Sequence, residues 1–128
     1  MFERYTQPSR HVIFLARDEA ANYGSRHIES EHLLLGVITA DNAIAERLAK
    51  DNMTELQIRA EIEKRTNRGE PLQTVEIPLS RECAKILRLA AKSADQLGHE
   101  MVEPEHLLLA ILRVEDCLAA QILRPKSP

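Results

Sequence analysis

Two segments of this chain, 74 positions apart, have closely similar sequences. Residues 28–38 read IESEHLLLGVI, and residues 102–112 read VEPEHLLLAIL. When the comparison is extended backwards, 10 of the 25 positions in residues 14–38 are identical to their counterparts in residues 88–112. A repeat of this length indicates one folding unit used twice, which we expect to pack about a pseudo-two-fold axis. Any surface site should then occur twice.

The composition favours a helical protein with an aliphatic core. Aromatic residues make up only 3% of the chain and Trp is absent, so Leu, Ile, Val and Ala must fill the interior. Four Gly and six Pro among many good helix formers favour helix over strand. At 128 residues the chain has the size of one domain. We predict a single all-α domain of two tandem helical repeats, with repeat one over residues 1–66, a connecting strap over 67–79 and repeat two over 80–124.

Each repeat is predicted to begin with a long helix. Thr6 and Ser80 are suitable N-cap residues, and apolar residues follow them at helical spacing until Gly24 and Gly98. These patterns place the helices at about residues 7–22 and from residue 81 to just before Gly98. Alanines at matched positions, 16 and 20 in one helix and 90 and 94 in the other, allow close helix approach. We therefore expect both helices near the centre of the molecule.

Shorter helices are predicted to follow in both repeats. The segments LLLGVI and LLLAIL are too apolar to face water on any side, so helices over 31–38 and 105–112 should be buried, the first with Ser30 as its N-cap. Third helices are expected at about 43–50 and 117–123. A fourth, from Thr54 to about Thr66, is predicted only in the first repeat, where Thr54 and Gln57 fit a capping box.

The connecting strap reads NRGEPLQTVEIPL, and its Gly and Pro residues are incompatible with a continuous helix. Its apolar residues favour an ordered segment over a flexible linker, and the run TVEI is suited to an extended backbone. We therefore expect burial of Leu72, Val75, Ile77 and Leu79.

Charge, hydropathy and motifs argue against several classes of protein. A net charge of −3 without a basic stripe argues against a nucleic-acid partner. No stretch approaches the roughly 20 apolar residues of a membrane span. The charged N-terminus lacks the apolar core of a signal peptide, so we expect a cytoplasmic protein without a membrane partner. No GxxxxGK[ST] motif is present and no nucleophile has an activating neighbour, so we expect no enzyme and no catalytic residue.

The cysteines and two of the histidines have structural interpretations. Cys83 and Cys117 belong to no CxxC motif, and we expect two small buried side chains, with a disulfide or metal role as the alternative. His32 and His106 each follow a glutamate, without further clustered ligands. A buried histidine bonded to a backbone group is therefore favoured over a zinc site, and we predict no metal and no cofactor.

The opening MFERYT, the two EHLLL segments after glycine-bounded loops and the two-half layout together resemble the Clp N-terminal domain. This is the double-repeat helical module at the front of ClpC and ClpA unfoldases, and the ClpC type is the most similar. The resemblance covers nearly the whole chain and lapses at the end, where the final helix of the family is missing. It implies a non-catalytic module that docks protein substrates and adaptor proteins onto a hexameric ATP-driven unfoldase.

The resemblance also implies a ligand, because the ClpC type is known to bind phosphoarginine at two symmetry-related surface pockets. By motif match, the pocket glutamates fall on Glu31 and Glu105, and the hydroxyl residues at the starts of the long helices fall on Thr6 and Ser80. A carboxylate can accept paired hydrogen bonds from the guanidinium, and a helix N-terminus can hold the phosphate. Each half of the chain supplies both ingredients.

The chain departs from the family pattern at both predicted pockets. Where the family usually has Gly-Thr before the Glu-His pair, this chain has Glu29-Ser30 and Glu103-Pro104. Each added carboxylate would repel a phosphate by about 1 kcal/mol or more in a watery pocket. Pro104 also removes one backbone N–H donor.

Charged residues near these positions leave alternatives open. Acidic residues are favourable in the first turn of any helix, so structural capping is the competing interpretation of Glu31 and Glu105. Arg4 and Arg10 lie near the start of the first long helix, where they are either solvated or help to hold an anion. Ala84 takes the place of Arg10 in the second half, so the two sites should be unequal.

Other classes of function also stay open. The domain is either part of a larger unfoldase or a free-standing paralogue, which the tail RPKSP slightly favours. A regulatory or structural protein of this fold could use it for oligomerisation without binding phosphoarginine, through an apolar patch expected where the final helix is missing. An enzyme with a metal at His32 or His106 is the third alternative.

Overall fold

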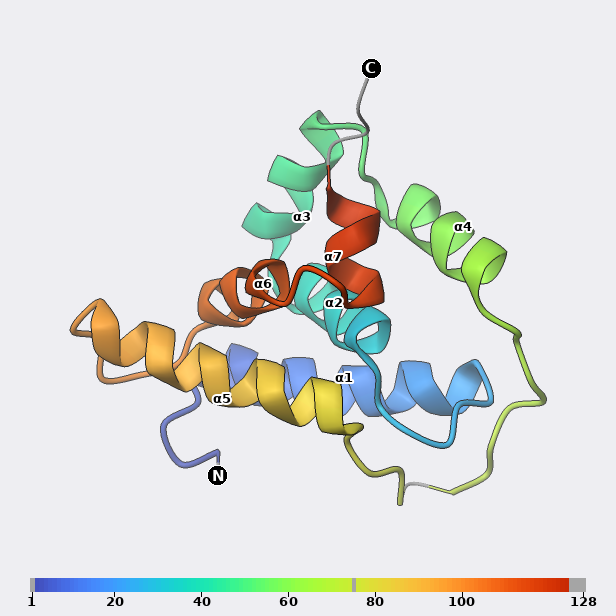
Figure 1. Cartoon of the computed structure of the whole chain (residues 1–128), viewed down its shortest axis with the longest axis horizontal. Helices are drawn as coiled ribbons and strands as arrows, with labels where there is room; N and C mark the ends of the chain where they lie inside the picture. The colour runs from blue at the N-terminus through green and yellow to red at the C-terminus, as the bar shows by residue number, and fades with distance from the viewer. Residues whose placement is uncertain (1, 75, 125–128) are drawn as a thin grey trace.

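The computed structural model describes residues 2–74 and 76–124 (Figure 1). The all-α prediction is confirmed, because these residues form seven helices and no strand. None of the described helices is long and apolar enough to cross a bilayer. The predicted helix ends lie within about two residues of the observed ones, which are α1 (Gln7–Asn22), α2 (Ser30–Ala40), α3 (Asn42–Lys50), α4 (Glu55–Arg65), α5 (Arg81–Gln96), α6 (Pro104–Arg113) and α7 (Leu118–Leu123).

The two long helices begin at the predicted capping residues. Thr6 Oγ1 accepts a hydrogen bond from the Ser9 N–H at the start of α1 (3.3 Å), and Ser80 Oγ accepts one from the Cys83 N–H at the start of α5 (3.0 Å). The capping box predicted at Thr54 is also present at the start of α4. Local hydrogen bonding therefore sets these helix starts.

One predicted cap is wrong. Helix α2 begins at Ser30, with Glu29 as its N-cap. The Ser30 hydroxyl instead accepts a hydrogen bond from the Ala119 N–H (3.1 Å), in the first turn of α7. This buried side chain thus satisfies a helix start in the other repeat, which no local sequence pattern reveals.

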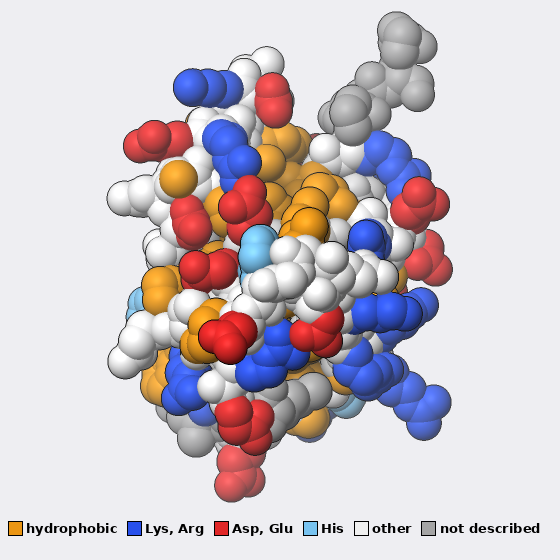
Figure 2. All heavy atoms as spheres, turned by 90° about the vertical axis from the view of Figure 1, so that its left-hand side faces the viewer, with side chains coloured by type: hydrophobic (Ala, Val, Ile, Leu, Met, Phe, Trp, Pro, Cys, Tyr) orange, Lys and Arg blue, Asp and Glu red, His pale blue; other side chains and the backbone are white. Residues whose placement is uncertain are grey.

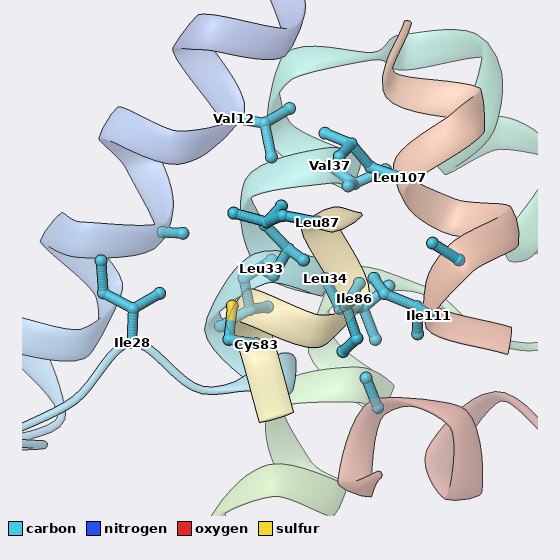
Figure 3. Packing of buried hydrophobic residues seen from close by; sticks show 14 of the residues in the cluster. Val12, Ile28, Leu33, Leu34, Val37, Cys83, Ile86, Leu87, Leu107 and Ile111 are labelled. Atoms are coloured by element: carbon cyan, nitrogen blue, oxygen red, sulfur yellow. The ribbon is translucent and has the colours of Figure 1, made fainter. Parts of the chain in front are cut away.

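The centre of the molecule is α2, not the pair of long helices. Figure 3 shows its Leu33, Leu34 and Val37 among core side chains of other helices. Helix α2 contacts the other six helices, and its residues 33–35 and Val37 are fully buried. The prediction that the two long helices lie at the centre is wrong. Their small residues allow close contact with the short helices, since α1 packs mainly on α2 and α5 mainly on α6. A Cβ at Gly36 of α2 would lie 2.5 Å from the Val12 carbonyl oxygen of α1, so these two helices touch backbone to backbone.

The prediction that both short helices are buried on every side is confirmed for α2 and wrong for α6. Leu107 and Ile111 of α6 are fully buried, whereas Leu109 and Leu112 are 41% and 43% exposed. Helix α6 packs on α1, α2, α5 and α7, and its side that carries these two leucines stays partly exposed among the described residues. This open side adjoins the candidate site.

The strap between α4 and α5 is held at both ends by backbone hydrogen bonds. The Gly69 and Leu72 N–H groups donate to carbonyls at the end of α1, and Leu79 forms a parallel bridge with the loop before α2. Ile77 is buried, while Leu72 and Leu79 are half-buried. Burial is thus confirmed for one predicted residue and partial for two, and Val75 lies outside the described residues. The domain bounds set at 1–66 and 80–124 stay a prediction.

Candidate functional site

The starts of four helices meet in pairs at two places. The Thr6 N–H donates to the Val102 carbonyl (3.2 Å), which puts the start of α1 beside the start of α6. The Ser80 N–H donates to the Ile28 carbonyl (3.1 Å), which puts the start of α5 beside the start of α2. We call them the α1–α6 corner (Thr6, Glu103 and Glu105) and the α5–α2 corner (Ser80, Glu29 and Glu31). The predicted ingredients are therefore paired across the two halves, not within each half.

The two predicted hydroxyl residues serve as helix caps in the structure. Their oxygens accept from backbone N–H groups in their own first turns, so each is already occupied. An anion at either corner would rely on the remaining N–H groups of the first turns. Pro8 and Pro104 remove two of these donors at the α1–α6 corner. The α5–α2 corner keeps its donors, since neither of its helices has a proline in the first turn.

Glu31 is a buried carboxyl group at the α5–α2 corner. Its residue is only 7% exposed, and burial raises the pKa of its carboxyl group above the ordinary value. A hydrogen bond with its own backbone N–H opposes this rise in pKa, while the charges of Glu29 and Glu82 add to it. The carboxyl group of Glu31 therefore bonds within the first turn of its own helix and has little access to a ligand.

Glu105, its counterpart, lies in a different environment at the α1–α6 corner. Its side chain is 60% exposed and forms an ion pair with Arg47 of α3 (3.4 Å). Exposure leaves this carboxylate open to a guanidinium, and Arg47 places a positive charge beside it. The two glutamates matched by sequence thus lie in unequal environments.

The charges around the two corners also differ. Burial raises the pKa of Glu82, in the first turn of α5, and the neighbouring Asp116 and Glu29 raise it further. With Glu31, four carboxyl groups therefore gather at the α5–α2 corner, which disfavours an anion there. The predicted anion partner Arg4 is committed elsewhere, because it donates to two carbonyls of the loop before α6 (2.8 and 3.1 Å) and pairs with Asp95 (2.8 Å).

The two repeated histidines are structural, as predicted. His32 Nδ1 accepts from the Glu29 N–H (2.9 Å), and His106 Nδ1 accepts from the Glu103 N–H (2.8 Å). Both residues are at most 3% exposed. Burial lowers the pKa of both rings, for His32 to about 4, which keeps Nδ1 free to accept. Each histidine therefore occupies the place that Glu or Gln takes in a capping box.

The cysteines are buried and unpaired, as the preferred interpretation predicts. Burial raises the pKa of the Cys83 thiol to about 12, so it stays protonated. Cys117 is the N-cap of α7, and its Sγ accepts from the Ala120 N–H (3.4 Å). Across the described part of the chain, no group of three or more His, Cys, Asp or Glu side chains is arranged to hold a metal ion.

An apolar hollow of about 300 Å³, which no sequence pattern indicated, adjoins the α1–α6 corner. It lies between α3 and α6, with Glu105 and Arg47 at its polar rim. Its floor is aliphatic and includes the exposed leucines of α6. On the face in Figure 2, hydrophobic side chains form a strip in the upper part, amid interspersed acidic and basic groups. A corner that offers a carboxylate, an arginine and an apolar floor is suited to a peptide.

Comparison with known proteins identifies the family. The profile of the Clp repeat (R) N-terminal domain matches residues 4–126. The chain belongs to the Clp N-terminal domain family. It is 39% identical over 124 residues to the chloroplastic chaperone protein ClpC1 of Oryza sativa subsp. japonica, and 38% identical to a ClpA homologue, the ATP-binding subunit of an ATP-dependent Clp protease, of Guillardia theta. These alignments cover 96% of this chain but 14% and 15% of the relatives, so the chain spans about one seventh of their length.

Solved Clp N-terminal domains share the fold. The N-terminal domain of ClpD from Arabidopsis thaliana matches with a TM-score of 0.81 at 23% identity, over 96% of this chain and 84% of that one. The Hsp104 N-terminal domain from Candida albicans matches with a TM-score of 0.71 at 21% identity, over 94% of this chain and 79% of that one. The predicted membership of this family is thus confirmed.

Proposed function

We propose that this domain is a non-catalytic docking module for protein substrates or adaptor proteins of a Clp-type ATPase. The observation that carries the proposal is the family match over residues 4–126, which includes both corners. Two features of the structure support it. The helices pack on a largely aliphatic core, which suits a rigid platform, and the α1–α6 corner combines charged and apolar groups on the surface.

We further propose that phosphoarginine on a partner is recognised mainly at the α1–α6 corner. The exposed carboxylate of Glu105 would accept the guanidinium N–H groups, and Arg47 would attract the phosphate. Thr6 would contribute by fixing the start of α1 against α6. The aliphatic floor between α3 and α6 would receive the residue that follows phosphoarginine in the partner.

The α5–α2 corner is the weaker candidate for the same ligand. Ser80 and Glu31 are in the positions that the family pattern predicts, and their backbone donors are intact. The buried Glu31 carboxyl group and the surrounding acidic residues oppose a dianionic phosphate. We therefore expect one dominant site per chain instead of two.

Isothermal titration calorimetry with a phosphoarginine peptide tests both parts. We expect binding near one equivalent per chain, weakened at least tenfold by Glu105→Gln and within about twofold of wild type for Glu31→Gln. Glu46→Gln on α3 is the matched control, because this exposed glutamate lies next to Arg47 in sequence. Loss of binding in Glu31→Gln but not in Glu105→Gln would reverse the site assignment.

Docking onto the ATPase needs a separate measurement. A pull-down of a ClpC-type hexamer and of its adaptors by the immobilised chain should succeed even without phosphoarginine. If neither the peptide nor these proteins bind, the docking function is refuted. A cytoplasmic location stays a prediction, which imaging of the tagged protein would check.

Oligomerisation through the same fold is the second candidate, and the exposed leucines of α6 favour it. Leu109 and Leu112 adjoin each other on a surface that a second copy could cover. Light scattering at increasing concentration tests this candidate, since a constant monomer mass excludes self-association. If a dimer does form, Leu109→Ser should abolish it.

A further inference from the structure

A second groove lies between α1 and the end of the strap, and it adjoins the α5–α2 corner through Ile28 and Leu79. Its volume is about 680 Å³. Phe14 of α1 is 57% exposed at its edge, although large aromatic side chains are usually buried. The apolar part of its lining consists of Phe2, Ile13, Phe14, Ile28, Ile77, Pro78 and Leu79.

Two arginines stand on the α1 wall of this groove. Arg10, Ile13, Phe14 and Arg17 are spaced at i, i+3, i+4 and i+7, so they share one face of the helix. The two arginine positions are about 10 Å apart along the helix axis. An apolar pair flanked by positive charges therefore forms one continuous stripe.

Neither arginine forms a salt bridge with a residue that the structure describes. Arg10 Nε donates to the Tyr5 carbonyl (3.3 Å), and its charge helps to lower the pKa of Glu3. The Arg17 guanidinium lies 4.4 Å from the centroid of the Phe14 ring, and its buried Nε has no hydrogen-bond partner within the described ranges. Burial of an unsatisfied charged donor is unfavourable. An incoming acceptor would remove that penalty.

We propose that this groove binds an amphipathic helix of a protein partner, with apolar residues flanked by two glutamates or aspartates. The complementary pattern is Glu-x-x-Φ-Φ-x-x-Glu, where Φ is a large apolar residue and the carboxylates are seven positions apart. Such a helix would lie along α1, with its apolar pair against Phe14 and Ile13 and its carboxylates on Arg10 and Arg17. Glu76 at the strap side would disfavour a third acidic residue there.

This inference rests on the proposed docking function and names one class of partner for it. Because the groove and the α1–α6 corner use different side chains, the two are tested separately. Phosphoarginine binding should survive changes in the groove, and the acidic helix should still bind Glu105→Gln.

The test measures fluorescence anisotropy of a labelled 15-residue helical peptide with this pattern, titrated with the whole chain. We expect Arg10→Gln with Arg17→Gln to weaken binding at least tenfold, and Phe14→Ser to do the same. A peptide with Gln in place of both Glu residues should bind at least tenfold more weakly, and added salt should reduce the difference.

Controls come from α4, which does not line the groove. Leu56→Ala and Lys64→Gln change an exposed apolar and an exposed charged side chain, and both should bind the peptide within about twofold of wild type. Because Phe14 is exposed, Phe14→Ser should fold, which circular dichroism checks. Failure of the wild-type chain to bind, or equal binding by the Gln peptide, would overturn the inference. Docking on a ClpC-type hexamer would then still be judged by its own assay.

Discussion

Replacement of His32 by Gln tests how a buried ring couples folding to pH. His32 Nδ1 accepts from the Glu29 N–H only while it is unprotonated. Burial lowers the pKa of His32 from the ordinary 6.5 to about 4, and the charge of Glu19 opposes this change. The unfolded chain therefore takes up a proton at higher pH than the folded chain. The stability contributed by the neutral ring is fully present above pH 6.5 and is lost as the pH falls toward 4.

The pKa values set the size of this effect. Lowering the pKa from 6.5 to about 4 corresponds to about 3 kcal/mol at the limit of low pH. Of this free energy, about 2 kcal/mol is lost between pH 7 and pH 5. Gln at this position keeps an acceptor for the backbone N–H, as in an ordinary capping box, but does not titrate.

Urea unfolding at pH 7 and pH 5 measures the difference in stability between wild type and His32→Gln. We expect the variant to gain about 2 kcal/mol relative to wild type on going from pH 7 to pH 5. His106 is present in both proteins, so its contribution cancels. His11→Gln is the control. It removes an exposed histidine and shows whether the loss of any histidine changes the dependence of the free energy of unfolding on pH in the same way. A difference between wild type and His32→Gln that is equal at both pH values would refute the reasoning.

Three further predictions concern stability. Gly36→Ala should lower the free energy of unfolding by about 1–3 kcal/mol in thermal or urea denaturation, because its Cβ would lie 2.5 Å from the Val12 carbonyl oxygen. Unchanged stability would mean that α1 can move away from α2 without a cost in free energy. Glu31→Gln should raise stability at pH 7 and lose this advantage toward pH 4, because burial raises the pKa of Glu31 and so penalises its charged form in the folded state only; a less stable variant at pH 7 would show that the charge is favourable. Arg59→Met should reduce stability by about 1–3 kcal/mol, because it removes the guanidinium that lies 2.6 Å from the half-buried Glu19. Differential scanning calorimetry measures the change, and an unfolding temperature equal to that of wild type would mean that the ion pair makes no net contribution to stability.

The sequence predicted the elements well because local physics sets their ends. Hydroxyl caps at Thr6, Thr54 and Ser80 and the glycines after the long helices mark the boundaries without reference to the rest of the chain. The histidines could also be interpreted, since a polar ring at the edge of an apolar helix must find a backbone partner.

The predictions that failed depend on which elements meet. Helix α2 can lie at the centre because Gly36 lets it approach α1 closely. A glycine within a helix does not show in the sequence which helix will pack against it. The same holds for Ser30, which caps a helix of the other repeat.

The candidate site shows the same limit. Glu31 and Glu105 have identical local sequence signals, yet one is buried and the other is exposed. The difference arises from their surroundings, since carboxyl groups crowd around Glu31 at the start of α5 while Arg47 of α3 faces Glu105. The groove along α1 was not predicted either, because the strap that forms its second wall has no regular pattern.

The two parallel bridges have a consequence for how the duplicated unit can exist. Tyr5 of the first repeat pairs with Val102 of the second, and Leu79, which enters the second, pairs with Ile28 of the first. Each repeat therefore forms one backbone bridge with the other, so the two repeats are held together reciprocally. A single copy would lose both bridges and the three helices of the other repeat that contact α2, so we expect an isolated repeat to fold stably only when a second copy takes the place of its missing half.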